Sequence, residues 1–266
     1  MFCPNCGCWN PDDSKFCSAC ATSMQAPTGT AAPANAVSSS NSFVERWRKI
    51  AVSPILLVLA AVLTLQAILS VTDAFDAILY GFEGLSYSFF AALVVIAKGV
   101  QTLAVLLLAV GLWLTYVDGM KKDSAEVNPL GISLTRIGVL VQLICGVVVA
   151  VGTFASLADL GALGYLISDS DGIAGLIGTI LGMGLALLYY FLLFGAANGA
   201  MNAATTKTSS ITKVGGAAIM SYVFAAFFLL YYVIINHQTD LVVFLQIGTM
   251  LVQGLALSQY KSEMSK

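Results

Sequence analysis

Charged residues are scarce in this 266-residue chain: Asp, Glu, Lys and Arg together make up 10% of it, and histidine occurs once. A soluble domain carries about 25% charged residues, because its surface must be hydrated. Apolar residues reach 58%, against roughly 45–50% in soluble domains. These proportions exclude a soluble globular protein and indicate a polytopic membrane protein, whose exterior faces lipid.

Sequence signatures of common enzymes are also absent. The chain has no G-x-S-x-G, H-E-x-x-H or G-x4-G-K-[ST] motif, and its one histidine, His237, falls in a short loop between apolar segments. A serine protease of the membrane would need a histidine and a serine facing each other within the bilayer. We therefore expect no enzymatic activity.

Long apolar segments make up most of the chain from residue 50 onward. A helix needs about 20 apolar residues to cross ~30 Å of hydrocarbon at ~1.5 Å per residue. Six segments qualify, at 50–71, 90–117, 134–158, 173–197, 214–235 and 241–258. Each must be helical, because lipid offers no hydrogen bonds to the backbone. No cleaved signal peptide is expected, since the chain does not begin with an apolar segment.

The expected fold is therefore an all-α integral membrane protein with six transmembrane helices between residues 50 and 258. The pattern S-[LI]-T-[RK]-[IV]-G occurs twice, at Ser133 and Ser210. The pattern suggests three hairpin repeats of common origin. It is explained equally well without repeats, because any helix that begins on the cytoplasmic side favours a basic residue there and small residues are common throughout the chain.

Basic residues are distributed asymmetrically along these helices. Loops 72–89, 159–172 and 236–240 contain no Lys or Arg, whereas 11 of the 12 basic residues lie in the segments on the opposite side. The positive-inside rule then places both termini in the cytoplasm, with residues 259–266 as a cytoplasmic tail. The expected location is the bacterial inner membrane, with membrane lipid as a partner.

The N-terminal segment 1–24 carries the strongest chemical signal. Cys3, Cys6, Cys17 and Cys20 form a C-x2-C pair, a ten-residue spacer and a second C-x2-C pair. Four thiolates at this spacing suit a tetrahedral Zn²⁺ ion, whose binding would fold a segment too short for an apolar core. Disulfides are the alternative, but they rarely persist in the cytoplasm. Cys8 is a spare thiol that lies outside this spacing.

The motifs CPNCG, NPDDSKF and CSAC resemble the short zinc ribbons found at the N-termini of many bacterial proteins. As a whole, the chain is similar to bacterial zinc-ribbon membrane proteins of unassigned function, a resemblance that implies zinc and a membrane but no reaction. Trp9 either covers the metal or contacts a partner protein. Nucleic acid is not expected as a partner, because Lys15 is the only basic residue of the ribbon.

Two short segments connect the ribbon to the membrane. Residues 25–42 are uncharged and rich in Ala, Pro, Ser and Thr, which is typical of a flexible linker. Residues 43–49 include RWRK together with Phe43 and Trp47. We expect an interfacial anchor here, in which the cations meet anionic lipid headgroups and the aromatic rings lie at the membrane boundary.

Apart from Arg136, the third residue of span 134–158, Lys98 is the only charged residue within a predicted span, and Gln101 and Thr102 follow it on the same helix face. An intramembrane charge is a functional candidate by default. Alternatively, Lys98 lies at the outer boundary and reaches the acidic residues of loop 72–89. The further polar stripe of Gln246, Thr249 and Gln253 is explained by helix packing, with the lining of a pore as the sharper alternative.

Two functions are compatible with these features. The favoured hypothesis is a non-enzymatic platform whose zinc ribbon recruits or senses a cytoplasmic protein partner. The alternative is a small-solute or ion transporter or channel with a regulatory ribbon, in which Lys98, Gln101 and Thr102 line the route. The sequence favours the platform, because no carboxylate lies within a predicted span.

Overall fold

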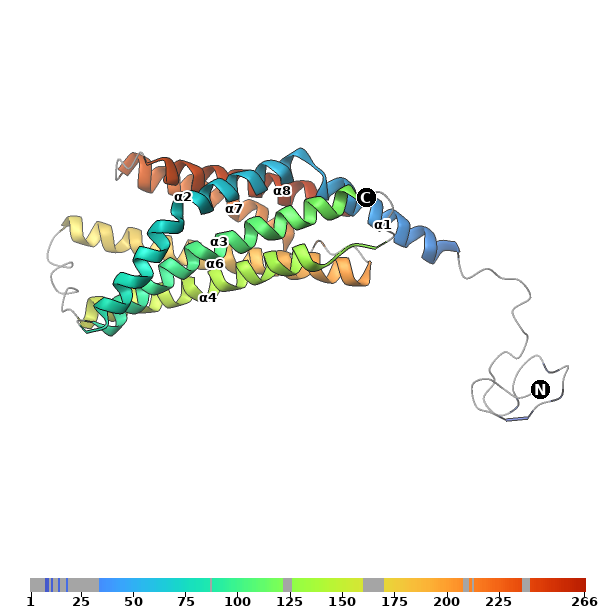
Figure 1. Ribbon diagram of the computed structural model, residues 1–266, viewed down its shortest axis with the longest axis horizontal. Coiled ribbons are helices and arrows are strands. Elements are labelled where there is room, and N and C mark those ends of the chain that lie inside the picture. The colour runs from blue at the N-terminus through green and yellow to red at the C-terminus, as the bar shows by residue number, and fades with distance from the viewer. Residues whose placement is uncertain are drawn as a thin grey trace. The chain divides into compact units, whose positions relative to one another are not determined.

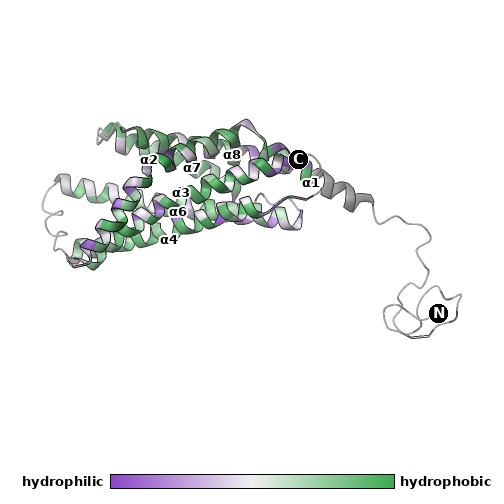
Figure 2. Ribbon diagram, viewed as in Figure 1, coloured by the Kyte–Doolittle hydropathy of each residue, from purple (hydrophilic) through white to green (hydrophobic). Residues whose placement is uncertain are grey.

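The computed structural model describes residues 34–86, 88–121, 126–159, 170–207, 213–235 and 240–266, together with Cys8, Trp9, Pro11, Ser14, Ser18 and Ile211. The chain divides into two units, Met1–Ser40 and Asn41–Lys266. The second unit holds six helices that are long and apolar enough to cross a membrane, which confirms the expected all-α, multi-pass membrane fold. Figure 2 shows hydrophobic residues along the whole length of these helices.

The six spanning helices pack side by side in alternating directions (Figure 1). They are α2 (Pro54–Gly84), α3 (Phe89–Met120), α4 (Leu130–Asp159), α6 (Ser170–Thr206), α7 (Val214–Phe228), which continues as the π-helix η1 (Leu229–Ile235), and α8 (Leu241–Met264). A shorter helix, α1 (Ala34–Ala51), precedes them. We call the end at which α2 begins and α8 finishes the basic end, because Lys49, Lys261 and Lys266 lie there. The opposite end is the far end.

The first spanning helix begins at Pro54, four residues later than the apolar run predicts. Proline lacks the amide hydrogen that would continue α1, yet it is well suited to the first turn of a new helix. Ser53 caps that turn, since its Oγ accepts a hydrogen bond of 3.2 Å from the backbone N–H of Leu56. The boundary between α1 and α2 is therefore set by the Ser-Pro pair rather than by hydropathy.

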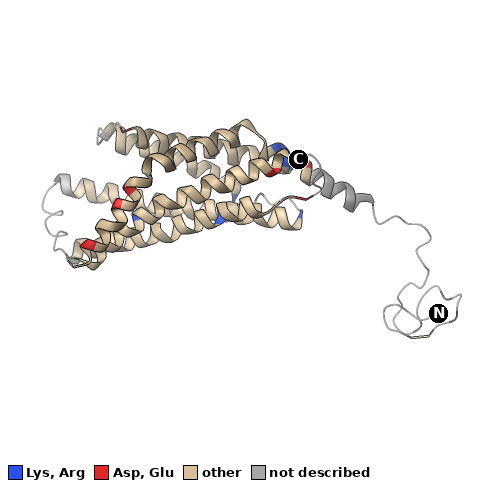
Figure 3. Ribbon diagram, viewed as in Figure 1, with Lys and Arg blue, Asp and Glu red and all other residues tan. Residues whose placement is uncertain are grey.

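Helix α2 runs on to Gly84, so most of segment 72–89, which was expected to be a loop, is helical. The apolar run ends at Asp73, but backbone hydrogen bonding does not require apolar side chains, so the helix extends beyond it. Acidic residues mark this extension in Figure 3. Similarly, α4 begins at Leu130, four residues before the predicted span, which places Arg136 in its second turn.

The six helices close into a ring in chain order. Each packs on the next along the chain, and α8 returns to pack on α2. The contacts of α3 with α2 and with α4 are the most extensive, so packing does not single out three separate hairpins. Between α3 and α4, a Cβ atom on Gly111 would lie 2.7 Å from the carbonyl oxygen of Gly131, a close approach that only small residues allow. This closed ring encloses an axial interior.

Helix α1 packs into the basic end of the ring through one apolar face. Its buried residues are Phe43, Val44, Trp47, Ile50 and Ala51, at the three- and four-residue spacing of a helix face. The aromatic rings of segment 43–49, expected at the lipid boundary, are instead buried against protein: Phe43 is 1% exposed and Trp47 7%. The helix itself begins at Ala34, within the segment expected to be a linker.

The C-terminal residues complete α8 instead of forming a free tail. Tyr260 and Met264 are buried, and the ring of Tyr260 contacts that of Trp47 edge-on, with centroids 6.2 Å apart. The two ends of the second unit, α1 and the last turns of α8, are thereby packed together at the basic end.

Candidate functional site

The ring encloses a cavity of about 490 Å³ in the half nearer the far end, and all six spanning helices contribute to its wall. We call this cavity the polar chamber. Its polar lining residues are Gln66, Ser70, Asp73, Lys98, Gln101, Thr102, Gln142, Tyr189, Tyr190, Tyr232, Gln246, Thr249 and Gln253. The volume lies within the range of about 300–1,000 Å³ that is usual for small-molecule sites.

Glutamine is concentrated in this wall. The described helices contain six glutamines, and five of them line the polar chamber: Gln66, Gln101, Gln142, Gln246 and Gln253. They come from α2, α3, α4 and α8. Only Gln259, near the end of α8, lies elsewhere. Because a buried amide without partners costs about 1–3 kcal/mol, such convergence in an otherwise apolar bundle needs a compensating role.

Part of that compensation is hydrogen bonding between helices. Tyr189 of α6 donates to Oε1 of Gln253 on α8 at 2.6 Å. Thr249 of α8 donates to Oε1 of Gln66 on α2 at 3.0 Å, which bridges the first and last spanning helices. These bonds use the amide oxygens. The NH₂ donors of Gln66 and Gln253 have no partner among the described residues, so they remain able to bind a molecule in the chamber.

Two charged residues, Lys98 on α3 and Asp73 on α2, lie at the chamber's outer rim. Lys98 is 22 residues from Met120, and Asp73 is 19 residues from Pro54, which corresponds to ~33 Å and ~28 Å of helix measured from the basic end. Both distances match the ~30 Å thickness of the hydrocarbon core. The two charged residues therefore lie about one membrane thickness from the basic end, and both are exposed.

A second, smaller cavity of about 160 Å³ lies in the half nearer the basic end. Its lining is almost entirely apolar, so we call it the apolar chamber. Leu63, Leu108 and Gln253 line both cavities and so form the wall between them. Two of these three residues are leucines, and apolar constrictions can close membrane pores by excluding water.

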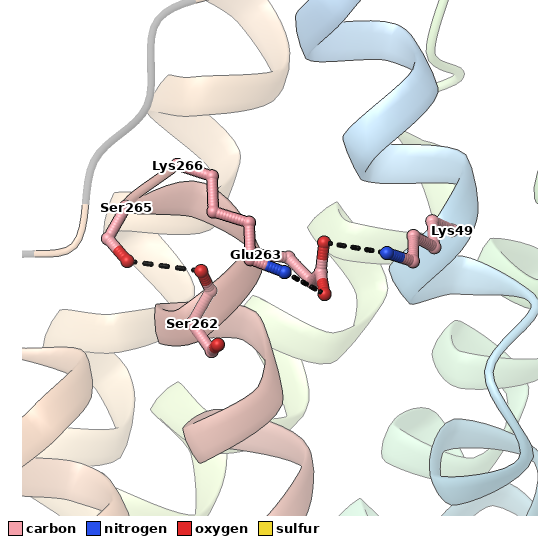
Figure 4. A network of polar contacts seen from close by, with 5 residues as sticks. All are labelled: Lys49, Ser262, Glu263, Ser265 and Lys266. Carbon is pink, nitrogen blue, oxygen red and sulfur yellow. Dashed lines mark hydrogen bonds and ion pairs between the residues drawn. The ribbon is translucent and has the colours of Figure 1, made fainter.

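Helix α1 closes the apolar chamber at the basic end, where Trp47, Ile50 and Ala51 form part of its lining. Figure 4 shows the polar contacts at the surface of this end. Nζ of Lys49 lies 3.2 Å from one carboxylate oxygen of Glu263, and Nζ of Lys266 lies 2.7 Å from the other. Glu263 thus connects α1 to the last turn of α8.

The structure brings together the three intramembrane residues singled out from the sequence. Lys98, Gln101 and Thr102 all line the polar chamber. Gln101 also donates a hydrogen bond of 3.4 Å to the backbone oxygen of Gln142 on α4. Lys98 itself is an exposed residue of this lining, with no ion pair to the described residues Asp73, Asp76 or Glu83.

The predicted zinc ligands, Cys3, Cys6, Cys17 and Cys20, lie outside the described residues, as does His237. Within the described part of the chain, no group of three or more His, Cys, Asp or Glu residues is arranged to hold a metal ion. Cys8 is exposed, Cys145 is buried in α4, and Trp9 is 66% exposed.

Several lining residues were not singled out from the sequence. Gln66 and Ser70 on α2 and the pair Tyr189-Tyr190 on α6 are examples. Gln66 and Ser70 are four positions apart and so share one helix face, a signal that was available but is common in membrane helices. Tyr232 lies in η1, and π-helical segments of this kind are frequent at functional sites.

Comparisons with protein-family models, curated proteins and solved structures found no match to this chain.

Proposed function

We propose that the six-helix ring is a route for a small polar solute, as a transporter or channel, held closed at the basic end in this conformation. The observation that carries this proposal is the polar chamber itself, a cavity of about 490 Å³ lined by five glutamines inside an apolar ring. It lies in the half nearer the far end, and the apolar chamber lies between it and the basic end. A solute-binding half followed by an apolar closure is the arrangement that alternating access or gating requires.

Energetic considerations favour this function over a passive platform. A ring that only anchors a ribbon would gain from buried amides no more than their hydrogen bonds between helices, whereas leucine in their place would pack without desolvation costs. Polar groups within membrane helices are correspondingly associated with substrate and ion pathways. One carboxylate does line the chamber: Asp73 belongs to α2 and lies at the outer rim, beyond the predicted span.

The zinc ribbon fits the same proposal as a regulatory module. Zinc on Cys3, Cys6, Cys17 and Cys20 is proposed from their spacing alone. The chain that leaves this segment leads directly into α1, the helix that closes the basic end. A protein bound to the ribbon would therefore act on the closure through the covalent chain.

The proposal is tested by solute entry into liposomes that contain the purified full chain, followed by stopped-flow light scattering with urea, glycerol and glycine. Gln142→Leu and Gln246→Leu should slow entry at least tenfold, because each removes an amide from the chamber. Gln259→Leu is the matched control, since this glutamine lies outside the chamber, and it should leave entry unchanged.

A second variant tests the closure. Replacing Leu63 and Leu108 together by alanine thins the wall between the chambers and should speed the entry of the same solutes. The proposal fails if neither the natural chain nor this double variant admits any of the solutes faster than empty liposomes do. Deletion of residues 1–24 should leave the route through the ring intact.

A further inference from the structure

Lys98 and Asp73 are the only charged residues that line the polar chamber, within the part of the chain that the structure describes. They lie at the same level, because the residues that follow them are in direct contact. A Cβ atom on Gly99 would lie 2.7 Å from the carbonyl oxygen of Ala74, so α2 and α3 approach each other closely here. The two charged residues therefore lie at a similar level on neighbouring helices, and both are exposed.

These two side chains have no ion-pair partner among the described residues, including each other. The polar groups that face them across the chamber are neutral: glutamine amides, tyrosine hydroxyls and the hydroxyls of Ser70, Thr102 and Thr249. An ammonium and a carboxylate that share one cavity without pairing are both available to a bound molecule. A ligand with a single charge would be attracted by one of them and repelled by the other.

We propose that the polar chamber takes a zwitterion, namely an α-amino acid with a short, neutral, polar side chain. The ligand's carboxylate binds Lys98 and its ammonium group binds Asp73, through charge-assisted hydrogen bonds. Its side chain points toward the glutamine amides deeper in the chamber. This inference rests on the proposed function and adds the chemical class of the solute.

The test uses the purified full chain in lipid nanodiscs and four probes measured by calorimetric titration. L-Glutamine carries both charges, glutaramic acid lacks the ammonium group, 4-aminobutanamide lacks the carboxylate, and butanamide lacks both. We expect L-glutamine to bind at least tenfold more tightly than any of the other three, since hydrogen bonds to charged groups are the stronger ones.

Two variants test which residue binds the carboxylate of the ligand and which binds its ammonium group. Lys98→Met should abolish the preference for L-glutamine over 4-aminobutanamide, because the partner of the carboxylate is gone. Asp73→Asn should abolish the preference over glutaramic acid. The matched controls are Lys207→Met and Asp76→Asn, at exposed positions outside the chamber, and both should bind like the natural chain. Thermal unfolding without ligand checks that each variant is folded.

The outcomes separate this inference from the function on which it rests. If butanamide binds as tightly as L-glutamine, and neither charge variant changes the order of affinities, the proposal of a zwitterionic ligand is wrong. The proposed route for a small polar solute is then unaffected. If none of the four probes binds, the zwitterion is also wrong. The route itself then fails only if urea, glycerol and glycine also enter no faster than into empty liposomes.

Discussion

Replacement of Trp47 by alanine should release α1 from the basic end of the ring. Trp47 is 7% exposed, contacts Phe43 and Tyr260 with ring centroids 6.2 Å apart in each case, and lines the apolar chamber. Truncation of a buried Phe or Trp to Ala costs about 3–5 kcal/mol. At about 1.4 kcal/mol per factor of ten, the ratio of docked to released α1 should fall more than a hundredfold.

The ion pair between Lys49 and Glu263, on the outside of α1, should contribute far less to the docking of α1. The side chain of Lys49 is 64% exposed, and exposed ion pairs contribute little because water and salt screen them. Lys49→Met is therefore the matched control on the same helix. If apolar packing holds the closure, α1 should stay docked in this variant and at high salt.

Pulsed electron spin resonance between labels at positions 45 and 240 measures the docking directly. The labels report the separation between α1 and the far end of α8, whose 24 residues are ~36 Å long. The natural sequence, with its other cysteines replaced, should give one narrow distance distribution, and Trp47→Ala a broad one. An unchanged narrow distribution in Trp47→Ala, or equal broadening in Lys49→Met, would refute the reasoning.

Three further predictions concern packing, metal and orientation. Gly111→Ala should lower the melting temperature, because its Cβ would lie 2.7 Å from the backbone of Gly131. Gly184→Ala, whose Cβ would have nothing within 4 Å, should preserve or raise the melting temperature. A larger drop in melting temperature for Gly184→Ala than for Gly111→Ala would contradict this packing. The full chain purified under reducing conditions should contain one zinc ion by elemental analysis. Cys17→Ser should lose that zinc and Cys8→Ser should retain it, and the opposite result would reassign the ligands. Among single cysteines at positions 39, 170 and 262, an impermeant maleimide should label only position 170 in intact cells, so labelling at 39 would reverse the orientation.

Hydropathy was sufficient to locate the helices but not their ends. All six predicted spans coincide with helices of the structure, because the requirement for backbone hydrogen bonds in lipid is independent of the fold. The predicted and observed helix boundaries differ where a charged residue ends the apolar run but does not end the helix. Asp73 ends the apolar run, yet α2 continues to Gly84, and α1 packs as a helix where the composition indicated a linker and a lipid anchor.

The polar chamber was only partly predictable. Lys98, Gln101 and Thr102 could be recognised on one helix, since a charge in an apolar span stands out. The closure of the ring between α2 and α8 determines which faces of the different helices meet. Thr249 and Gln66, which hydrogen-bond across that closure, are 183 positions apart, and no local pattern connects them.

The proposed route requires a water-filled polar chamber that opens at the far end and is closed toward the basic end. The most direct test introduces single cysteines into a chain without other cysteines and applies a small, charged, impermeant methanethiosulfonate from the far side. Position 102 in the polar chamber should react, because the reactive thiolate forms only where water reaches it. Position 196 in the apolar chamber and position 110 on the lipid-facing surface of α3 should not react. A cysteine at 102 as unreactive as the one at 110 would contradict the chamber, and equal reaction at 102 and 196 would contradict the closure.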